Sequence, residues 1–171
     1  MRKRQISPTA ASVPPSGQTW LDVERTALVE VTSEENGFPI ESALLGGENQ
    51  GWRAAYPGTQ TIRLIFDEPQ YLRRIWLDFK DSENARTQEF VLRWSPDGGD
   101  SFREIVRQQW NFSPPESVQE IEDYVVELSA VTTLELVIVP DKSGGTARAS
   151  LASLCVAVNA QESPLQPQSN R

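Results

Sequence analysis

Hydrophobic and polar residues alternate along most of this chain, in short runs that are separated by turn residues. Residues 61–67 carry Ile, Leu and Phe at every second position, and the end of a second run, residues 72–79, repeats that spacing. Because successive side chains of a β-strand point to opposite faces, each run predicts a strand with one buried face. The intervening Asp67-Glu68-Pro69 predicts a turn, since proline cannot donate a hydrogen bond to a β ladder.

Further strands are predicted over residues 26–32, 88–95, 102–112, 123–128, 133–139 and 147–158. Asp97-Gly98-Gly99-Asp100 predicts a hairpin, because glycine adopts the positive φ angles that tight turns need. Residues 39–45 predict one short helical turn, and the acidic residues 116–122 predict an exposed loop. About eight short strands without a long helical pattern favour an all-β fold, an antiparallel β-sandwich or jelly roll.

The two ends of the chain lack this alternation. Residues 1–18 are rich in proline, serine, threonine and alanine, and residues 160–171 in proline, serine and glutamine. Such compositions predict a disordered arm and a disordered tail. We therefore expect one domain over residues 19–159, and a chain of 171 residues is long enough to give that domain a sizeable core.

Composition narrows the possible functions. The net charge is −8, and an acidic surface repels phosphate backbones, so nucleic-acid binding is not expected. The chain has no histidine, which removes the commonest general base and the commonest metal ligand. We therefore expect no enzyme activity. The single cysteine, Cys155, lies in an apolar run and is expected to be a small buried hydrophobic residue.

The first residues, MRKRQ, are basic, but no apolar segment follows them. A secretory signal is therefore not predicted. No window approaches the ~18 apolar residues that a membrane-spanning helix needs. We expect a cytoplasmic protein that does not enter a membrane.

Three stretches carry a family resemblance: QTIRLIF at residues 60–66, FVLRWSPDGGDSF at 90–102 and ASLASL at 149–154. In this order they resemble the galactose-binding-like superfamily, which includes the discoidin or coagulation factor 5/8 type C domains. The resemblance covers residues 20–158 and implies a jelly-roll sandwich. Sugar-binding members use loops at one end of the sandwich, so the resemblance implies a non-enzymatic, carbohydrate-binding module.

Two other stretches are similar to a narrower group. WRAA at residues 52–55 and NFSPPES at 111–117 match, in order, the pattern of the N-terminal domain of the X-ray-repair single-strand-break scaffold protein. That domain works in protein–protein contact. This likeness implies an alternative function, a cytoplasmic protein-interaction domain of the scaffold type.

The discoidin resemblance also raises the question of a metal. Many such domains hold a structural calcium ion with an Asp before the tryptophan loop and a Glu in the last strand. Here the first segment reads Gly46-Gly47-Glu48-Asn49, and Ser153 stands where the Glu is expected. Calcium takes about six to eight oxygen ligands, with carboxylates among them. We therefore expect no family-type calcium site and no other cofactor, while Glu48 and backbone carbonyls leave a weak metal site open.

The candidate ligand site is the loop end around Trp52. A sugar site needs a flat apolar wall beside polar groups that bind hydroxyls. The residues that would supply these parts, if their loops cluster, are Asn49, Trp52, Arg53, Tyr56 and Arg86. Alternatively, Trp52 belongs to the core and Arg53 pairs with a neighbouring acid. The sequence leaves open whether the partner is a carbohydrate or a protein, and it does not determine the oligomeric state.

Overall fold

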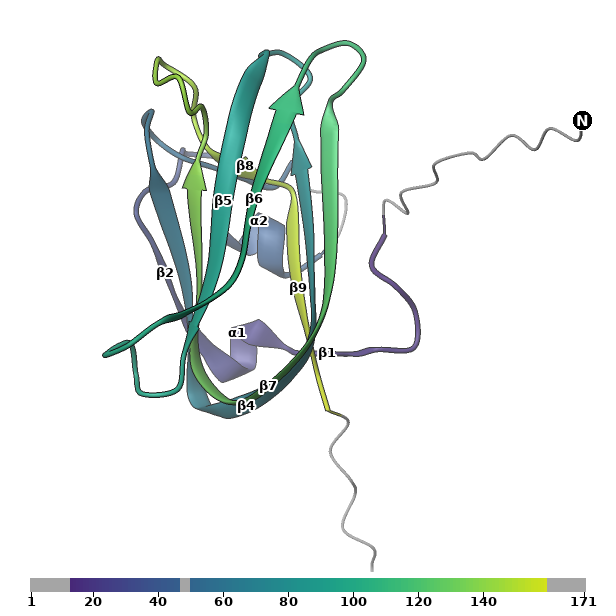
Figure 1. Cartoon of the computed structure of the whole chain (residues 1–171), viewed down its shortest axis with the longest axis vertical. Coiled ribbons are helices and arrows are strands. Elements are labelled where there is room, and N and C mark those ends of the chain that lie inside the picture. The colour runs from purple at the N-terminus through teal and green to yellow at the C-terminus, as the bar shows by residue number, and fades with distance from the viewer. Residues whose placement is uncertain (1–12, 47–49, 160–171) are drawn as a thin grey trace, which may run out of the picture.

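The computed structural model describes residues 13–46 and 50–159. Within them the chain folds into two β layers that face each other (Figure 1). The predicted all-β antiparallel sandwich is therefore confirmed. The predicted tail, residues 160–171, lies outside the described residues, and so does most of the predicted arm, residues 1–18.

The larger sheet has the strand order β1-β9-β4-β7-β5-β6, with β2 also paired to β4, and β3 pairs with β8 separately. The pairings are antiparallel. The elements are β1 (Thr19–Trp20), α1 (Val23–Thr26), β2 (Ala27–Val31), α2 (Glu41–Leu44), β3 (Trp52–Arg53), β4 (Gln60–Lys80), β5 (Arg86–Ser95), β6 (Arg103–Phe112), β7 (Gln119–Val139), β8 (Ser150–Leu151) and β9 (Ser153–Val158).

The predicted turn at residues 67–69 is wrong. β4 is one strand, and β7 pairs with it on both sides of Pro69. The register shifts between Ile65 and Gln70, so the proline lies in an irregularity where no ladder hydrogen bond is required of it. β4 and β7 bend together at the lower end of Figure 1 and pass from one layer into the other. This shared bend joins the two layers.

The strands predicted over residues 123–128 and 133–139 are likewise one strand, β7. Ala130, between the two runs, has a positive φ of 57°, which fits a bend at this point. β7 begins at Gln119, so the exposed acidic loop expected over residues 116–122 is wrong for its second half. Glu120 is fully buried there. The prediction failed because the run of charged residues does not reveal that this segment pairs with β4.

The core lies between the layers and is closed by aromatic residues. Trp52, Phe79, Phe90 and Phe112 are each at most 1% exposed, and the rings of Phe79 and Phe90 stack with centroids 5.2 Å apart. Burial of such side chains is the main favourable term in folding. Cys155 is half-buried on β9, and burial raises the pKa of its thiol.

The two ends of the sandwich differ. Thr19 of β1 pairs with Val158 of β9, so the described chain enters and leaves at one end, low in Figure 1. The β3–β8 pair and the loop before β8 lie at the other end. Neither described helix, at four residues each, is long enough to cross a membrane.

Candidate functional site

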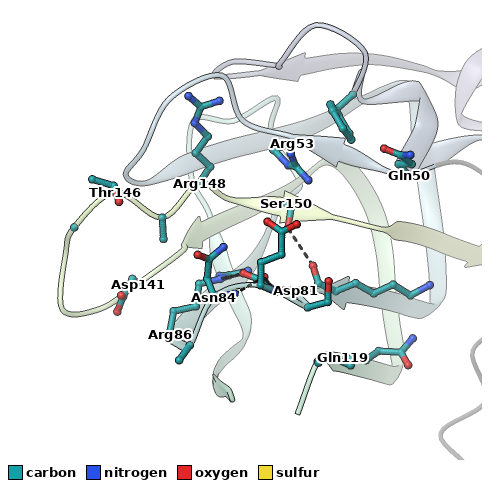
Figure 2. Close-up of a pocket in the computed structure, with 18 of the residues that line it drawn as sticks. Gln50, Arg53, Asp81, Asn84, Arg86, Gln119, Asp141, Thr146, Arg148 and Ser150 are labelled. Atoms are coloured by element: carbon teal, nitrogen blue, oxygen red, sulfur yellow. Dashed lines mark hydrogen bonds and ion pairs between the residues drawn. The ribbon is translucent and has the colours of Figure 1, made fainter. Parts of the chain in front are cut away.

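A cleft of about 900 Å³ opens at the end of the sandwich that carries β3 and β8. Three segments that are distant in sequence line it: residues 80–86, residues 144–150, and the region around Arg53 (Figure 2). Loops held by a rigid sandwich are where binding residues are commonly found, and this volume lies within the usual range of ligand sites.

The short β3–β8 ribbon forms one wall of the cleft. Trp52 pairs with Leu151, and Arg53 pairs with Ser150. Because side chains alternate along a strand, Trp52 and Leu151 are buried in the core while Arg53 and Ser150 line the cleft. Arg148, two residues before Ser150, lines the same wall, so the ribbon brings two arginines together.

Gly51 allows this ribbon to form. Its φ is +77°, and a Cβ at this position would lie 2.4 Å from the carbonyl oxygen of Leu151. Only glycine adopts this backbone conformation readily and leaves room for the other strand. The position of Arg53 therefore depends on a glycine two residues earlier.

Arg53 and Arg148 share one carboxylate. The Nη1 atoms of the two arginines lie 3.6 Å from different oxygens of Glu35, and the two arginine side chains are 45% and 43% exposed. The guanidinium of Arg53 also lies over the ring of Phe38, 4.3 Å from its centroid. These contacts hold both guanidinium groups at the cleft wall, with much of their surface open to solvent.

The loop after β4 forms the opposite wall. The Asp81 carboxylate accepts hydrogen bonds from the backbone N–H groups of Glu83 and Asn84, at 2.9 and 3.0 Å, which fixes the turn. It also accepts one from Nε of Arg86 at 2.7 Å. Burial acts to raise the pKa of Asp81, but Arg86 and the two backbone donors outweigh it, so the pKa is lowered.

Arg86 holds the loop after β4 in place from a buried position. Its side chain is 1% exposed, and its Nη1 donates to the carbonyl oxygen of Pro140 at 2.7 Å. Its guanidinium lies 4.5 Å from the centroid of the Phe112 ring. Together with the ion pair to Asp81, these contacts tie the loop after β4 to the loop after β7.

The charges that line the cleft are mixed. The pKa of Asp141 is lowered by hydrogen bonds from the side-chain hydroxyl and backbone N–H of Ser143. Asp81 and Asp141 are therefore ionised at neutral pH. Among the described residues, the charged side chains that line the cleft are Arg53, Lys80, Arg86 and Arg148 on the cationic side and Asp81, Glu83 and Asp141 on the acidic side.

The structure brings together two of the five predicted site residues, Arg53 and Arg86. Trp52 is 1% exposed and its Nε1 donates to the carbonyl oxygen of Ser33, so its ring is closed to a ligand, as the core alternative expects. Tyr56 is 49% exposed but does not line the cleft. Asn49 lies outside the described residues, next to Gln50, which does line the cleft.

Sequence reasoning missed Arg148, Asn84 and Ser150. Asp81-Ser82-Glu83-Asn84 is a run of polar residues between two predicted strands, and that was a usable signal for a loop at one end of the sandwich. Arg148 had no such signal, because only the pairing of β8 with β3 places it beside Arg53.

The described residues do not fit the calcium site of discoidin-type domains. Ser153 Oγ lies 3.6 Å from Sγ of Cys155, and its strand partner is Asp78. The Asp78 carboxylate is already occupied by Gln119 Nε2 at 2.9 Å and by Lys80 Nζ at 3.6 Å, and the lysine supplies the positive charge there. No group of three or more potential metal ligands occurs in residues 13–46 and 50–159. Glu48 and Asn49 lie outside these residues, so the absence of calcium stays a prediction.

No protein-family model matches this chain, and no curated protein sequence matches it. Solved structures do. The family 32 carbohydrate-binding module of Clostridium perfringens NanJ, in complex with galactose, is 18% identical, with a TM-score of 0.60 over 81% of this chain and 98% of that one. A family 32 module of the C. perfringens protein GH89, in complex with GalNAc-β-1,3-galactose, is 22% identical, with a TM-score of 0.61 over 82% of this chain and 100% of that one.

An F5/8 type C domain from Bacteroides fragilis is 14% identical, with a TM-score of 0.58 over 83% of this chain and 97% of that one. This chain shares the β-sandwich fold of these modules and of this domain. At these identities the likeness establishes the fold alone. The closer likeness to the X-ray-repair scaffold domain finds no support among these structures, nor does the scaffold-type function that it implied.

Proposed function

We propose that this protein is a non-enzymatic carbohydrate-binding domain that takes its ligand in the cleft between the β3–β8 ribbon and the loop after β4. The observation that carries the proposal is the convergence of Arg53 and Arg148 on one wall with Asp81 and Asn84 on the other. Sugar hydroxyls donate and accept hydrogen bonds. Guanidinium donors facing carboxylate and amide oxygens therefore match a ring that carries hydroxyls on both edges.

The similar structures support a sugar as the ligand. Two of them are modules in complex with galactose or with GalNAc-β-1,3-galactose, and the sandwich that they share with this chain offers loops at its ends for ligand contact. The cleft here lies at the end opposite the entry and exit of the described chain.

The carboxylates of the cleft favour binding over hydrolysis. A glycoside hydrolase pairs one ionised carboxylate with a general acid whose pKa is raised. Asp81 and Asp141 both have lowered pKa values, because Arg86 holds the first and Ser143 the second. Neither is suited to donate a proton to a leaving group at neutral pH.

A glycan array followed by titration calorimetry tests the proposal. We expect wild-type protein to bind one class of sugar, and Asn84→Ala and Arg148→Ala to weaken that binding. The melting temperature should stay close to wild type, because both residues are at the surface of a loop. Arg25→Ala, on α1 and far from the cleft, is the matched control and should bind normally. If no sugar bound on the array or in calorimetry, the proposed function would be refuted.

A further inference from the structure

The two arginines on the β3–β8 wall have an incomplete set of anionic partners. Each lies 3.6 Å from its oxygen of Glu35, which is longer than the roughly 2.7–2.9 Å of a charge-assisted hydrogen bond. Two cations are thus held near one carboxylate without either being bonded tightly to it. One of the Glu35 oxygens, Oε2, is buried without a hydrogen-bond partner.

The same chain closes such a triad elsewhere. Glu135 accepts from Nε of Arg63 at 2.7 Å and from Nε of Arg93 at 2.9 Å, and its carboxylate is fully buried. The guanidinium groups of Arg63 and Arg93 are 43% and 38% exposed, but each already donates a hydrogen bond of ordinary length to Glu135. The contacts of Arg53 and Arg148 with Glu35 do not reach that length, so these two guanidinium groups keep more of their donors for a ligand.

The opposite wall does not supply the missing anion. Asp81 is paired with Arg86, and Asp141 accepts from Ser143. Glu83 is exposed. The described residues that line the cleft carry four cationic and three acidic side chains, in a chain whose net charge is −8. Because Arg86 pairs with Asp81 and Lys80 pairs with Asp78, the excess of positive charge lies on the β3–β8 wall, where two arginines share the one carboxylate of Glu35. That wall favours an anionic group of a ligand.

Stacking offers the ligand little by comparison. Phe38 is the aromatic residue among the described residues of the cleft, and the Arg53 guanidinium already lies over its ring. A neutral sugar bound mainly through an aromatic face would need that ring free. A planar guanidinium, in contrast, binds a planar carboxylate through two parallel hydrogen bonds.

We propose that the sugar carries a carboxylate, as in a hexuronate residue, and that Arg53 and Arg148 bind it while the loop after β4 binds ring hydroxyls. This inference rests on the proposed function and gives it a ligand class. Arg148 sets the preference for charge, because within the described residues it contacts no aromatic ring and its only ion-pair partner is Glu35.

The test compares ligands that differ only in charge. Titration calorimetry would use short oligogalacturonides and the same oligomers with their carboxylates methyl-esterified. We expect the acidic form to bind about tenfold more tightly, and we expect added salt to reduce that difference. Arg148→Gln should bring the two affinities together. Arg25→Gln, which breaks another loose surface pair, with Asp22 at 3.6 Å, should leave the preference intact.

Each outcome has a distinct meaning. Equal affinity of wild-type protein for the acid and its ester would overturn the carboxylate proposal and leave the sugar-binding function standing. Tighter binding of a sulfated galactan than of the galacturonide would overturn the choice of a carboxylate in favour of a sulfate. Failure of every sugar to bind would overturn the proposed function itself. If Arg148→Gln did not fold, the comparison of the acid and the ester with wild-type protein would still decide whether a carboxylate is preferred.

Discussion

Two arginines surround one glutamate at two places in the described structure. The ion pairs are short at one place and long at the other. In the sheet, Arg63, Glu135 and Arg93 form short hydrogen bonds around a carboxylate with no exposed surface. In the cleft, Arg53 and Arg148 stay 3.6 Å from Glu35. Residue types alone would not distinguish a closed ion cluster from an open one.

The difference lies in what holds each triad. Glu135 of β7 is the strand partner of Arg63 on β4 and of Arg93 on β5, so the ladders on both sides fix the three side chains across adjacent strands. Glu35 and Arg148 lie outside the strands, and only Arg53 belongs to one. Regular strand pairing therefore produces a closed cluster, and loops at the end of the sandwich produce an open one.

Removing the buried carboxylate should have the largest effect on stability. Glu135→Gln replaces the buried carboxylate that accepts hydrogen bonds from Arg63 and Arg93. A hydrogen bond to a charged group is worth about 1.5–3 kcal/mol, so we expect the two together to cost about 3 kcal/mol. Urea denaturation would measure this loss. A change below about 1 kcal/mol would mean that the closed triad behaves as a surface pair.

Gly51→Ala should disrupt the open triad and spare the closed one. The added Cβ would lie 2.4 Å from the Leu151 carbonyl oxygen at a positive φ, so β3 must shift away from β8. We expect a loss of about 2 kcal/mol together with a loss of sugar affinity. Gly58→Ala is the control, because its φ is also positive, at +95°, but its Cβ meets no atom within 4 Å. Equal effects of the two changes on sugar binding would contradict the role given to Gly51.

Another buried glutamate, Glu120, has no arginine bonded to it and provides a pH-dependent contrast. Burial and the nearby Glu122 raise its pKa from 4.5 to about 8. Because the folded-state pKa is raised, its contribution to stability is complete below about pH 4.5 and is lost as the pH rises towards 8. The free energy of unfolding should therefore fall as the pH rises through that window. Glu120→Gln should flatten the profile measured by urea denaturation, and an unchanged slope would exclude this carboxyl as its source.

The smallest effect on stability is expected at the open triad itself. Glu35→Gln removes a carboxylate from two loose, partly exposed ion pairs, which are worth less than about 1 kcal/mol together. The same urea experiment as for Glu135→Gln gives the comparison. If Glu35→Gln were as costly as Glu135→Gln, the distinction between open and closed triads would fail.

The amino-acid pattern predicted the strands and the sandwich well, because alternation reports directly which face of a strand is buried. Of the five residues predicted for a ligand site, Arg53 and Arg86 line the cleft, although the Arg86 side chain is buried. It did not predict that β4 and β7 continue past Pro69 and Ala130. A local pattern cannot distinguish a turn between two strands from an irregularity within one, since the partner strand decides whether the ladder resumes.

Sequence by itself therefore determined the all-β class, the strand positions and the lack of histidine chemistry. The tertiary structure decided which arginine side chains line the cleft. Trp52 and Arg53 are neighbours in the chain, yet the pairing of β3 with β8 buries one and turns the other to the cleft beside Arg148. Alternation along a strand determines that neighbouring side chains point to opposite faces. Only packing determines which of the two faces is exposed to solvent.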